Sequence, residues 1–280
     1  MKIDSLIKIS SIKDNDFYNF SFDERVKYLK YLSINIVREK NIFFIETKNE
    51  KHRIEFKDSY VNINDFNFNI YKIDKIEDFI ISSILDCYMS YEFNNHSHIS
   101  PFFNIEKTDV VLDIGSGFGF FSKYIENSVS KIIMIEPSPF FNNLLKQNFN
   151  NEIYDLFLSS NIGYININDT HKDGYKIDGL KSDTKVEIKT TTIDSFFLDM
   201  KFNFIRMDVE NSEINIIDGA KKYIEKYKPK LSIAIYHSFL NGYLIKEKLL
   251  SINPNYHIHF SGICERHGSN KISPMILYAW

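Results

Sequence analysis

The stretch VVLDIGSGFGFFS, residues 110–122, decides the fold of this chain. Val110 to Ile114 is an apolar run that ends at a glycine, which is typical of a strand buried on both faces. Gly115, Gly117 and Gly119 follow at intervals of two, and the apolar residues after them predict a helix over 120–127. A strand, a glycine loop and a helix in this order open many nucleotide-binding α/β domains.

Beyond the loop, short apolar runs alternate with helical patterns. We expect strands at residues 131–135, 153–158, 202–209, 231–236, 257–262 and 275–280, helices at residues 140–148 and 213–226, and a hairpin within 164–189. This alternation predicts an α/β fold with a Rossmann-like, mostly parallel seven-stranded sheet and helices on both faces.

Residues 1–94 have a different pattern. Apolar residues at helical spacing predict a helix over 23–39, alternating residues predict a hairpin from 42–46 and 52–56, and a second helix is expected over 76–91. No glycine-rich linker follows. We therefore expect an α+β extension, residues 1–94, that forms a cap or a homodimer interface on a main domain, residues 95–280.

Composition excludes several classes of protein. With 280 residues, 44% of them hydrophobic and 25% charged, the chain can bury a large core. A net charge of -3 makes nucleic acid a poor partner. The two cysteines, far apart, argue against a disulfide framework. No apolar run suits a signal peptide or an integral membrane helix, so we expect a cytoplasmic protein.

The glycine loop predicts a bound ligand. A tight turn without Cβ atoms lets a ligand approach the backbone. The dinucleotide pattern G-x-G-x-x-G is not met, because residue 120 is Phe. Asp113, just before the loop, suits a cationic group such as the ammonium or sulfonium of S-adenosyl-L-methionine better than a pyrophosphate. We expect Gly115, Ser116 and Gly117 to cradle the methionyl part of this cofactor.

Two further positions are expected to bind the cofactor. Glu136 ends the second expected strand and precedes Pro137, about 20 residues after the loop, where an acid accepts hydrogen bonds from ribose hydroxyls. Ser160 follows the third expected strand and would border the adenine.

The segment FIRMDVENSEINIIDGA, residues 204–220, supplies carboxylates. Strand periodicity places Arg206, Asp208 and Glu210 on one face. The last two would project beyond the carboxyl end of their strand, where ligands bind, and Asp208 would also border the cofactor. Glu213 falls in the first turn of the next helix, where it either serves the site or complements the helix dipole.

His237, directly after the strand expected at 231–236, is the first candidate for a general base. Asp208 and Glu210 are the alternatives for this catalytic role. A hydrogen-bonded structural histidine is an equally good interpretation of His237.

Two H-x-H pairs have the spacing of metal ligands on a strand, His96 with His98 and His257 with His259. Because such isolated pairs are more often incidental, we expect no metal site. A magnesium ion at Asp208 is a conceivable alternative, since this ion prefers carboxylates.

The succession of these motifs resembles the FkbM-type family of S-adenosylmethionine-dependent methyltransferases over about residues 108–280. The segments that carry the resemblance are VVLDIGSGFGFFS, IIMIEPSP, TIDSFF, FIRMDVENSEINIIDGA, KPKLSIAIYH and ISPMILYAW.

The fourth segment is the most specific, because the family pattern there is close to K-x-D-x-E-G-x-E followed by Gly-Ala. This chain has Arg206 where the family usually has lysine, and Asn211 in place of a glycine. Asn tolerates left-handed backbone geometry, so we expect the turn to be kept.

The resemblance implies a class I methyltransferase fold and O-methylation, frequently of sugar hydroxyls in polysaccharides, glycolipids or secondary metabolites. Two alternatives stay open. An NAD(P)-dependent oxidoreductase shares the acid at the end of the second strand, and a non-catalytic homologue would bind the cofactor or a partner protein without transferring a methyl group.

Overall fold

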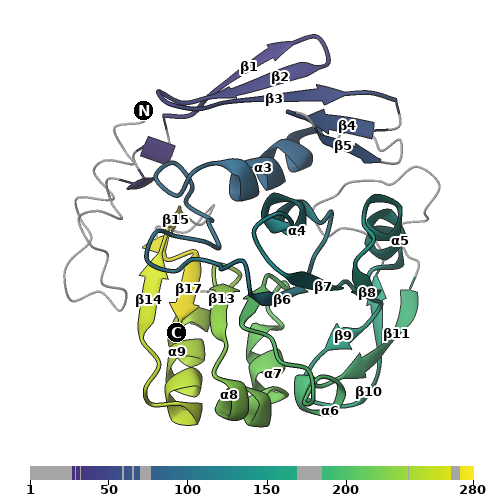
Figure 1. The fold of residues 1–280 in the computed structure, drawn as a ribbon, viewed down its shortest axis with the longest axis vertical. Helices are drawn as coiled ribbons and strands as arrows, with labels where there is room; N and C mark the ends of the chain where they lie inside the picture. The colour runs from purple at the N-terminus through teal and green to yellow at the C-terminus, as the bar shows by residue number, and fades with distance from the viewer. Residues whose placement is uncertain are drawn as a thin grey trace.

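Figure 1 shows the computed structural model of the chain as a stack of layers: an N-terminal sheet, a layer of helices, a central sheet and a second layer of helices. The structure describes residues 27–28, 30–31, 33–58, 60–64, 66–69, 77–168, 185–238, 240–265 and 272–280.

The central sheet has seven strands among the described residues. Their order is β14 (Ile258–Ser261), β17 (Ile276–Ala279), β13 (Lys230–Ala234), β12 (Phe204–Met207), β6 (Val110–Ile114), β7 (Lys131–Ile135) and β8 (Glu152–Tyr154). The strands from β13 to β8 pair in parallel, whereas β17 pairs antiparallel with both of its neighbours. The sheet is therefore mixed, which corrects the expectation of a mostly parallel sheet.

Helices cover both faces of this sheet (Figure 1). One face carries α4 (Phe120–Ile125) and α5 (Pro139–Asn148), and the other carries α7 (Glu213–Asp218), α8 (Lys221–Tyr227) and α9 (Asn241–Ile252). The alternation along β7 shows how one strand serves both layers. Ile132 and Met134 join the core beneath α4 and α5, while Ile133 and Ile135 join the core on the opposite side.

The N-terminal layer is an antiparallel sheet with the order β1 (Asn35–Glu39), β2 (Ile42–Glu46), β3 (Lys51–Phe56), β4 (Tyr60–Ile63) and β5 (Phe66–Asn69). The hairpin expected at 42–56 is confirmed as β2 and β3, and the helix expected at 76–91 is α3 (Glu77–Tyr88).

The helix expected over 23–39 is wrong for its second half. Residues 27, 28, 30 and 31 are helical, but residues 35–39 form β1 and pair with β2. Ile36 and Val37 are β-branched, and the ladder formed with β2 outweighs the helical spacing of the apolar residues.

Two other expected elements are divided in the structure. The strand expected at 153–158 becomes β8 and β9 (Phe157–Leu158), and β9 lies in a separate sheet with the hairpin of β10 (Gly163–Asn168) and β11 (Lys185–Thr191). The helix expected at 213–226 is interrupted at Gly219, where a Cβ atom would lie 2.1 Å from the Ser159 carbonyl oxygen. The close approach of two loops therefore requires glycine there and separates α7 from α8.

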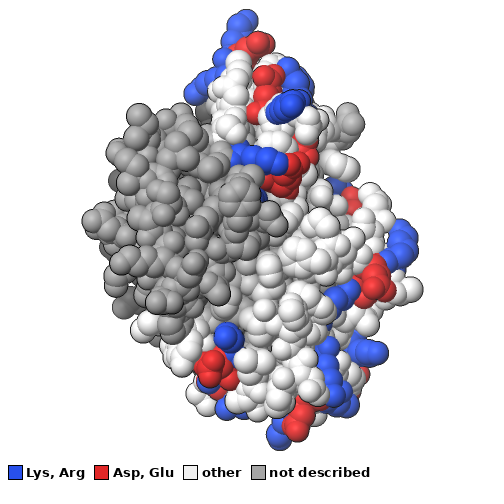
Figure 2. Space-filling model, turned by 90° about the vertical axis from the view of Figure 1, so that its left-hand side faces the viewer, with Lys and Arg blue, Asp and Glu red and all other residues white. Residues whose placement is uncertain are grey.

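The remaining described elements are the short helix α6 (Ile193–Phe196) and the pair of β15 (Cys264–Glu265) and β16 (Ile272–Ser273). Within the described residues, none of the helices is both long and apolar enough to cross a membrane. Figure 2 shows basic and acidic side chains intermingled on the described part of one face, which accords with the small net charge.

Candidate functional site

A row of polar side chains crosses the centre of the seven-stranded sheet. Arg206 on β12 is the register partner of Asp113 on β6 and of Ser232 on β13. Ser232 is in turn the partner of Tyr278 on β17. All four side chains are buried. Because alternate residues of a strand share a face, the row lies on the side covered by α3 and α4.

Arg206 is the central member of this row. Its Nη1 donates to the Gly115 carbonyl oxygen at 2.8 Å and to Asp113 Oδ1 at 3.2 Å, and its Nη2 donates to Asp208 Oδ2 at 2.8 Å. Burial opposes the positive charge, but the carboxylates of Asp208 and Asp113 raise the pKa of the guanidinium. The planar fork thus ties the glycine loop to the ends of two strands.

Asp113, which was expected to bind the cofactor, has both carboxylate oxygens bonded to protein side chains in this structure. Its side chain has no exposed surface, and its second oxygen accepts a hydrogen bond from Ser122 Oγ at 2.7 Å. The alternation of β6 turns the carboxylate inward against α4, where Arg206 already neutralises it. Asp113 therefore helps to position the glycine loop through Arg206, which also bonds the Gly115 carbonyl oxygen.

The glycine loop leaves open space at one residue. A Cβ atom on Gly117 would meet no atom within 4 Å, and its φ is +53°. By contrast, a Cβ on Gly115 would lie 2.0 Å from the Asp208 carbonyl oxygen, and one on Gly119 would lie 2.5 Å from the Phe149 ring. Gly115 and Gly119 are thus required by packing, whereas Gly117 borders the space that a ligand can fill.

Glu136 lies beside this open space, at the end of β7. Its Oε2 accepts a hydrogen bond from the Gly117 amide at 2.8 Å, and its Oε1 accepts one from the Ser138 amide at 2.9 Å. Pro137 lies between Glu136 and Ser138, which caps α5. Ser116 bonds inward, because its hydroxyl donates to the Asp113 carbonyl oxygen at 2.9 Å. The carboxylate of Glu136 is therefore fixed next to the loop by two backbone amides.

Ser160, which was expected to border the adenine, does not follow the third strand of the seven-stranded sheet. β8, the third strand of the seven-stranded sheet, ends at Tyr154, so Asp155 is the first residue beyond its carboxyl end, and it is exposed. Ser160 instead follows β9 in the separate sheet, and its hydroxyl accepts a hydrogen bond from Asn161 at 3.0 Å. The expectation for Ser160 assumed one continuous strand over 153–158, and the polar Asp155 within that segment was the signal against it.

Beyond β12 the chain makes a strained turn. Glu210 and Asn211 have φ values of +52° and +75°. Asn211 therefore adopts the left-handed geometry expected of it. A left-handed Glu is rarer and costs about 1–2 kcal/mol. Strain of this kind clusters at functional sites. The Glu210 side chain is 71% exposed, while that of Asp208 is 17% exposed.

Three carboxylates surround His237. Its Nδ1 lies 2.8 Å from Glu213 Oε1, and its Nε2 lies 3.5 Å from Glu210 Oε2 and 3.6 Å from Asp208 Oδ1. Burial lowers the pKa of His237, but the contacts with Glu210 and Glu213 and the charge of Asp208 outweigh it and raise the pKa to about 10. The imidazole is thus protonated at neutral pH, which makes it a poor proton acceptor.

Glu213 belongs to this cluster and does not merely complement a helix dipole. It is fully buried, and its Oε2 accepts a hydrogen bond from the side-chain Nδ2 of Asn241 on α9 at 3.4 Å. Glu213 contacts the Nδ1 side of the His237 ring, whereas Asp208 and Glu210 lie on the Nε2 side.

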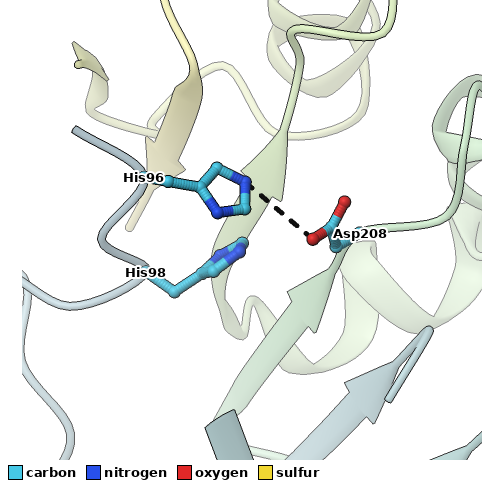
Figure 3. Close-up of side chains that lie close together, drawn as sticks. All are labelled: His96, His98 and Asp208. Carbon is cyan, nitrogen blue, oxygen red and sulfur yellow. Dashed lines mark ion pairs between the residues drawn. The ribbon is translucent and has the colours of Figure 1, made fainter. Parts of the chain in front are cut away.

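The first H-x-H pair joins the same region. Figure 3 shows the rings of His96 and His98 projecting toward Asp208 from the segment between α3 and β6. His96 Nε2 lies 3.9 Å from Asp208 Oδ2, and His98 Nδ1 is hydrogen-bonded to Ser232 Oγ at 2.8 Å. Burial, the Arg206 charge and His96 hold the pKa of His98 well below its ordinary value.

His96 differs from His98 in its electrostatic surroundings. Burial alone would lower the pKa of His96, but the carboxylates of Asp86 and Asp208 raise it. The second H-x-H pair lies elsewhere, with His257 against the Trp280 ring and His259 against the Phe102 ring. The H-x-H motif singled out His96 and His98 in the sequence, but their nearness to Asp208 depends on the fold.

Comparison with known proteins identifies one family. The family model described as the methyltransferase FkbM domain matches residues 113–260, more than half of the chain. A search of curated proteins finds no match.

Three of the solved structures that the chain matches are described as methyltransferases or methylases. Methyltransferase FkbM from Methylobacillus flagellatus KT is 22% identical, with a TM-score of 0.49, and the match covers 70% of this chain and 47% of that chain. The ribosomal protein L11 methylase from Lactobacillus delbrueckii subsp. bulgaricus is 11% identical, with a TM-score of 0.37 and coverage of 62% and 70%. Precorrin-6y C5,15-methyltransferase from Geobacter metallireducens GS-15 is 13% identical, with a TM-score of 0.35 and coverage of 63% and 81%.

Proposed function

The chain belongs to the FkbM family of S-adenosylmethionine-dependent methyltransferases, and we propose that it transfers the methyl group of this cofactor to a hydroxyl of a sugar or a cell-surface glycan precursor. The observation that carries the proposal is the open space at Gly117, which lies beside the Glu136 carboxylate. Through Gly115 and Arg206, the same loop contacts Asp208, at the edge of the His237 cluster.

The residues around the loop fit the cofactor. Gly115, Ser116 and Gly117 would cradle its methionyl part, since a side chain at 117 would fill the free space. Glu136, followed by Pro137, would accept hydrogen bonds from the ribose, and Asp155 would border the adenine in the place first given to Ser160. When bound, the cofactor supplies a methyl group on a positively charged sulfur, which the ionised carboxylate of Asp208 would attract.

Burial alone would raise the pKa of Asp208, but the charge of Arg206, followed by those of His96 and His237, lowers it. Asp208 is therefore a better electrostatic partner for a cation than a proton acceptor. In this proposal it replaces Asp113 as the carboxylate that faces the positive charge of the cofactor.

The acceptor would bind against Glu210, Asp208 and His237. Attack of a hydroxyl on the methyl group needs in-line positioning and the removal of one proton. Glu210 is the proposed proton acceptor, because its carboxylate is exposed and the strained turn holds it beside His237. His237, enclosed by three carboxylates, would orient Glu210 and Asp208. The candidate base thus changes from His237 to Glu210, one of the alternatives that the sequence offered.

Isothermal titration with S-adenosylhomocysteine tests the cofactor assignment. We expect binding to the full chain, and we expect Glu136→Ala to weaken it by at least about tenfold, since two or more hydrogen bonds to a carboxylate are lost. The matched control is Glu152→Ala on β8, whose carboxylate is bonded to Lys131 on the surface. Binding of NAD(H) in place of S-adenosylhomocysteine would support the oxidoreductase alternative and sink this proposal.

Transfer of a tritiated methyl group to a panel of nucleotide sugars and glycan precursors tests the acceptor. Acceptor-dependent labelling is expected, and it would exclude a non-catalytic homologue. Labelling of amines in place of hydroxyls would overturn the O-methyl assignment. The homodimer and the cytoplasmic location stay predictions, to be checked by light scattering and by cell fractionation.

A further inference from the structure

His96, His98 and Asp208 form a cluster at the carboxyl end of β12, and we propose that this cluster binds one divalent transition-metal ion of the zinc type (Figure 3). One ligand atom from each residue lies within 4.8 Å of the other two. Both histidines are buried, and the Asp208 side chain is 17% exposed.

Unsatisfied ring nitrogens point to a missing partner. Among the described residues, the buried Nε2 atoms of His96 and His98 have no hydrogen-bond partner, and Nδ1 of His96 has only the Asp86 carboxylate, at 3.5 Å. Buried polar atoms in native proteins are normally paired, so each exception calls for an explanation such as an ion. A metal ion satisfies imidazole nitrogens without any further donor or acceptor.

The segment that carries both histidines is held in place independently of any ion. The Asn95 side chain donates to the Ile263 carbonyl oxygen at 2.6 Å and accepts from the Ile263 amide at 3.0 Å. The Tyr278 hydroxyl donates to the Ser97 carbonyl oxygen. The two rings are therefore preorganised beside Asp208, as expected of a built site.

The donor set selects the kind of ion. Two imidazoles and one carboxylate suit zinc and its first-row neighbours, whereas magnesium and calcium prefer oxygen ligands. Zinc lies about 2.0–2.2 Å from nitrogen and oxygen ligands, so the ligand atoms of one ion are at most about 4.4 Å apart. Because the three ligand atoms already lie within 4.8 Å of one another, small side-chain rotations would bring them all into range.

Neighbouring groups support the ligands. The Ser232 hydroxyl holds Nδ1 of His98 and leaves Nε2 to bind an ion, and Asp86 Oδ2 lies 3.5 Å from Nδ1 of His96. Carboxylates and hydroxyls that hold the second nitrogen are typical partners of metal-binding histidines. The five carboxylates of the region also outnumber its two cations, Arg206 and the protonated His237, so the region favours an added cation; the carboxylates are those of Asp86, Asp113, Asp208, Glu210 and Glu213.

Three protein ligands leave one coordination position free. An oxygen of the acceptor would occupy that position, and the ion would then place the acceptor hydroxyl at the end of β12. This part of the inference rests on the proposed function. Binding of the ion itself does not depend on the methyl transfer.

Titration of zinc chloride into metal-free full-length protein tests the inference, with cobalt(II) absorption as a second readout. We expect one ion per chain and visible cobalt bands that change when a histidine ligand is removed. His96→Gln and His98→Gln should each weaken zinc binding by about tenfold or more. The matched control is His257→Ala, which removes an exposed histidine of the other H-x-H pair and should leave the affinity unchanged.

Thermal unfolding and S-adenosylhomocysteine binding of each variant show whether the fold is intact. If the unaltered protein binds no zinc, or if His257→Ala loses as much affinity as His98→Gln, the metal site is refuted. Absence of zinc with normal S-adenosylhomocysteine binding would refute this inference alone. Zinc binding without S-adenosylhomocysteine binding would refute the proposed function alone.

Discussion

Two glycines of the loop, Gly117 and Gly119, both have positive φ but differ in what surrounds them. Open space lies beside Gly117, whereas the Phe149 ring and Leu145 lie against Gly119. The same residue type thus serves ligand access at one position and helix packing at the other. Sequence spacing alone treats the two as equivalent.

We predict that Gly117→Ala weakens S-adenosylhomocysteine binding by at least about tenfold, because the methyl group enters the space assigned to the cofactor. Its stability should fall by only about 1–2 kcal/mol, the cost of a left-handed alanine. Gly119→Ala has the same backbone cost plus a clash with Phe149. Its free energy of unfolding, measured with urea, should therefore fall further. Equal stability losses in the two variants would contradict this account.

The contacts of Arg206 could not be predicted from the sequence. Its two terminal nitrogens contact three oxygens, on Gly115, Asp113 and Asp208. A lysine ammonium is a single point charge and cannot reproduce this fork.

We therefore predict that Arg206→Lys, which introduces the residue that the family usually carries, destabilises this chain by about 1.5–3 kcal/mol, the value of a lost hydrogen bond to a charged group. Urea unfolding measures the change. Lys230→Arg is the matched control, because Lys230 makes a partly exposed pair with Asp109. If Arg206→Lys were as stable as the unaltered protein, the guanidinium hydrogen bonds would not contribute to stability as predicted.

At the scale of elements, the turn between β12 and α7 sets the direction of the carboxylates. Two successive residues with positive φ reverse the chain there, and Ser212 then precedes α7. The left-handed backbone conformation is strained at Glu210, whereas Asn211 tolerates it better. A strained element that keeps a carboxylate next to His237 is the arrangement expected where function opposes stability.

We predict that Glu210→Gly stabilises the protein by about 1 kcal/mol, because glycine removes the left-handed penalty. The same variant should lose most of its methyl transfer, because the proposed proton acceptor is gone. Glu210→Gln keeps the strain, so its stability should stay near that of the unaltered protein while its turnover falls. Full turnover in either variant would remove Glu210 from the mechanism.

At the scale of the whole molecule, the N-terminal layer and the seven-stranded domain share a hydrophobic core. The ring of Phe68 on β5 lies 4.9 Å from that of Phe120 on α4 and 6.3 Å from that of Phe149. One continuous cluster of buried residues runs from β2 through α3 and α4 to the central sheet. The division into residues 1–94 and 95–280 stays a prediction, and this core argues for cooperative unfolding across it.

We predict that Phe68→Ala lowers the free energy of unfolding by about 3–5 kcal/mol, the usual cost of removing a buried phenyl ring. Unfolding should remain a single transition when followed by circular dichroism and by the fluorescence of Trp280 in the C-terminal part. Tyr164→Ala, at a side chain that is 70% exposed, is the control and should change little. Two separate transitions in the unaltered protein would show that the layers fold independently.

The sequence by itself determined the elements whose signals are local. Val110–Ile114, the glycine loop, Glu136 at the end of β7 and the helix α3 all follow from apolar periodicity and from glycine chemistry over a few residues. The family, too, was evident from such short motifs. Local signals suffice because strand burial and tight turns depend mainly on neighbouring residues.

Only the tertiary structure decided which side chains meet. The register of β6, β12 and β13 turned Asp113 inward onto Arg206 and brought Ser232 beneath His98. Pairing with β2 made a strand of residues 35–39, whose spacing predicted a helix. The contact of His96 and His98 with the end of β12 joins residues more than 100 positions apart. Such contacts depend on how whole elements pack, and no periodicity within one segment encodes them.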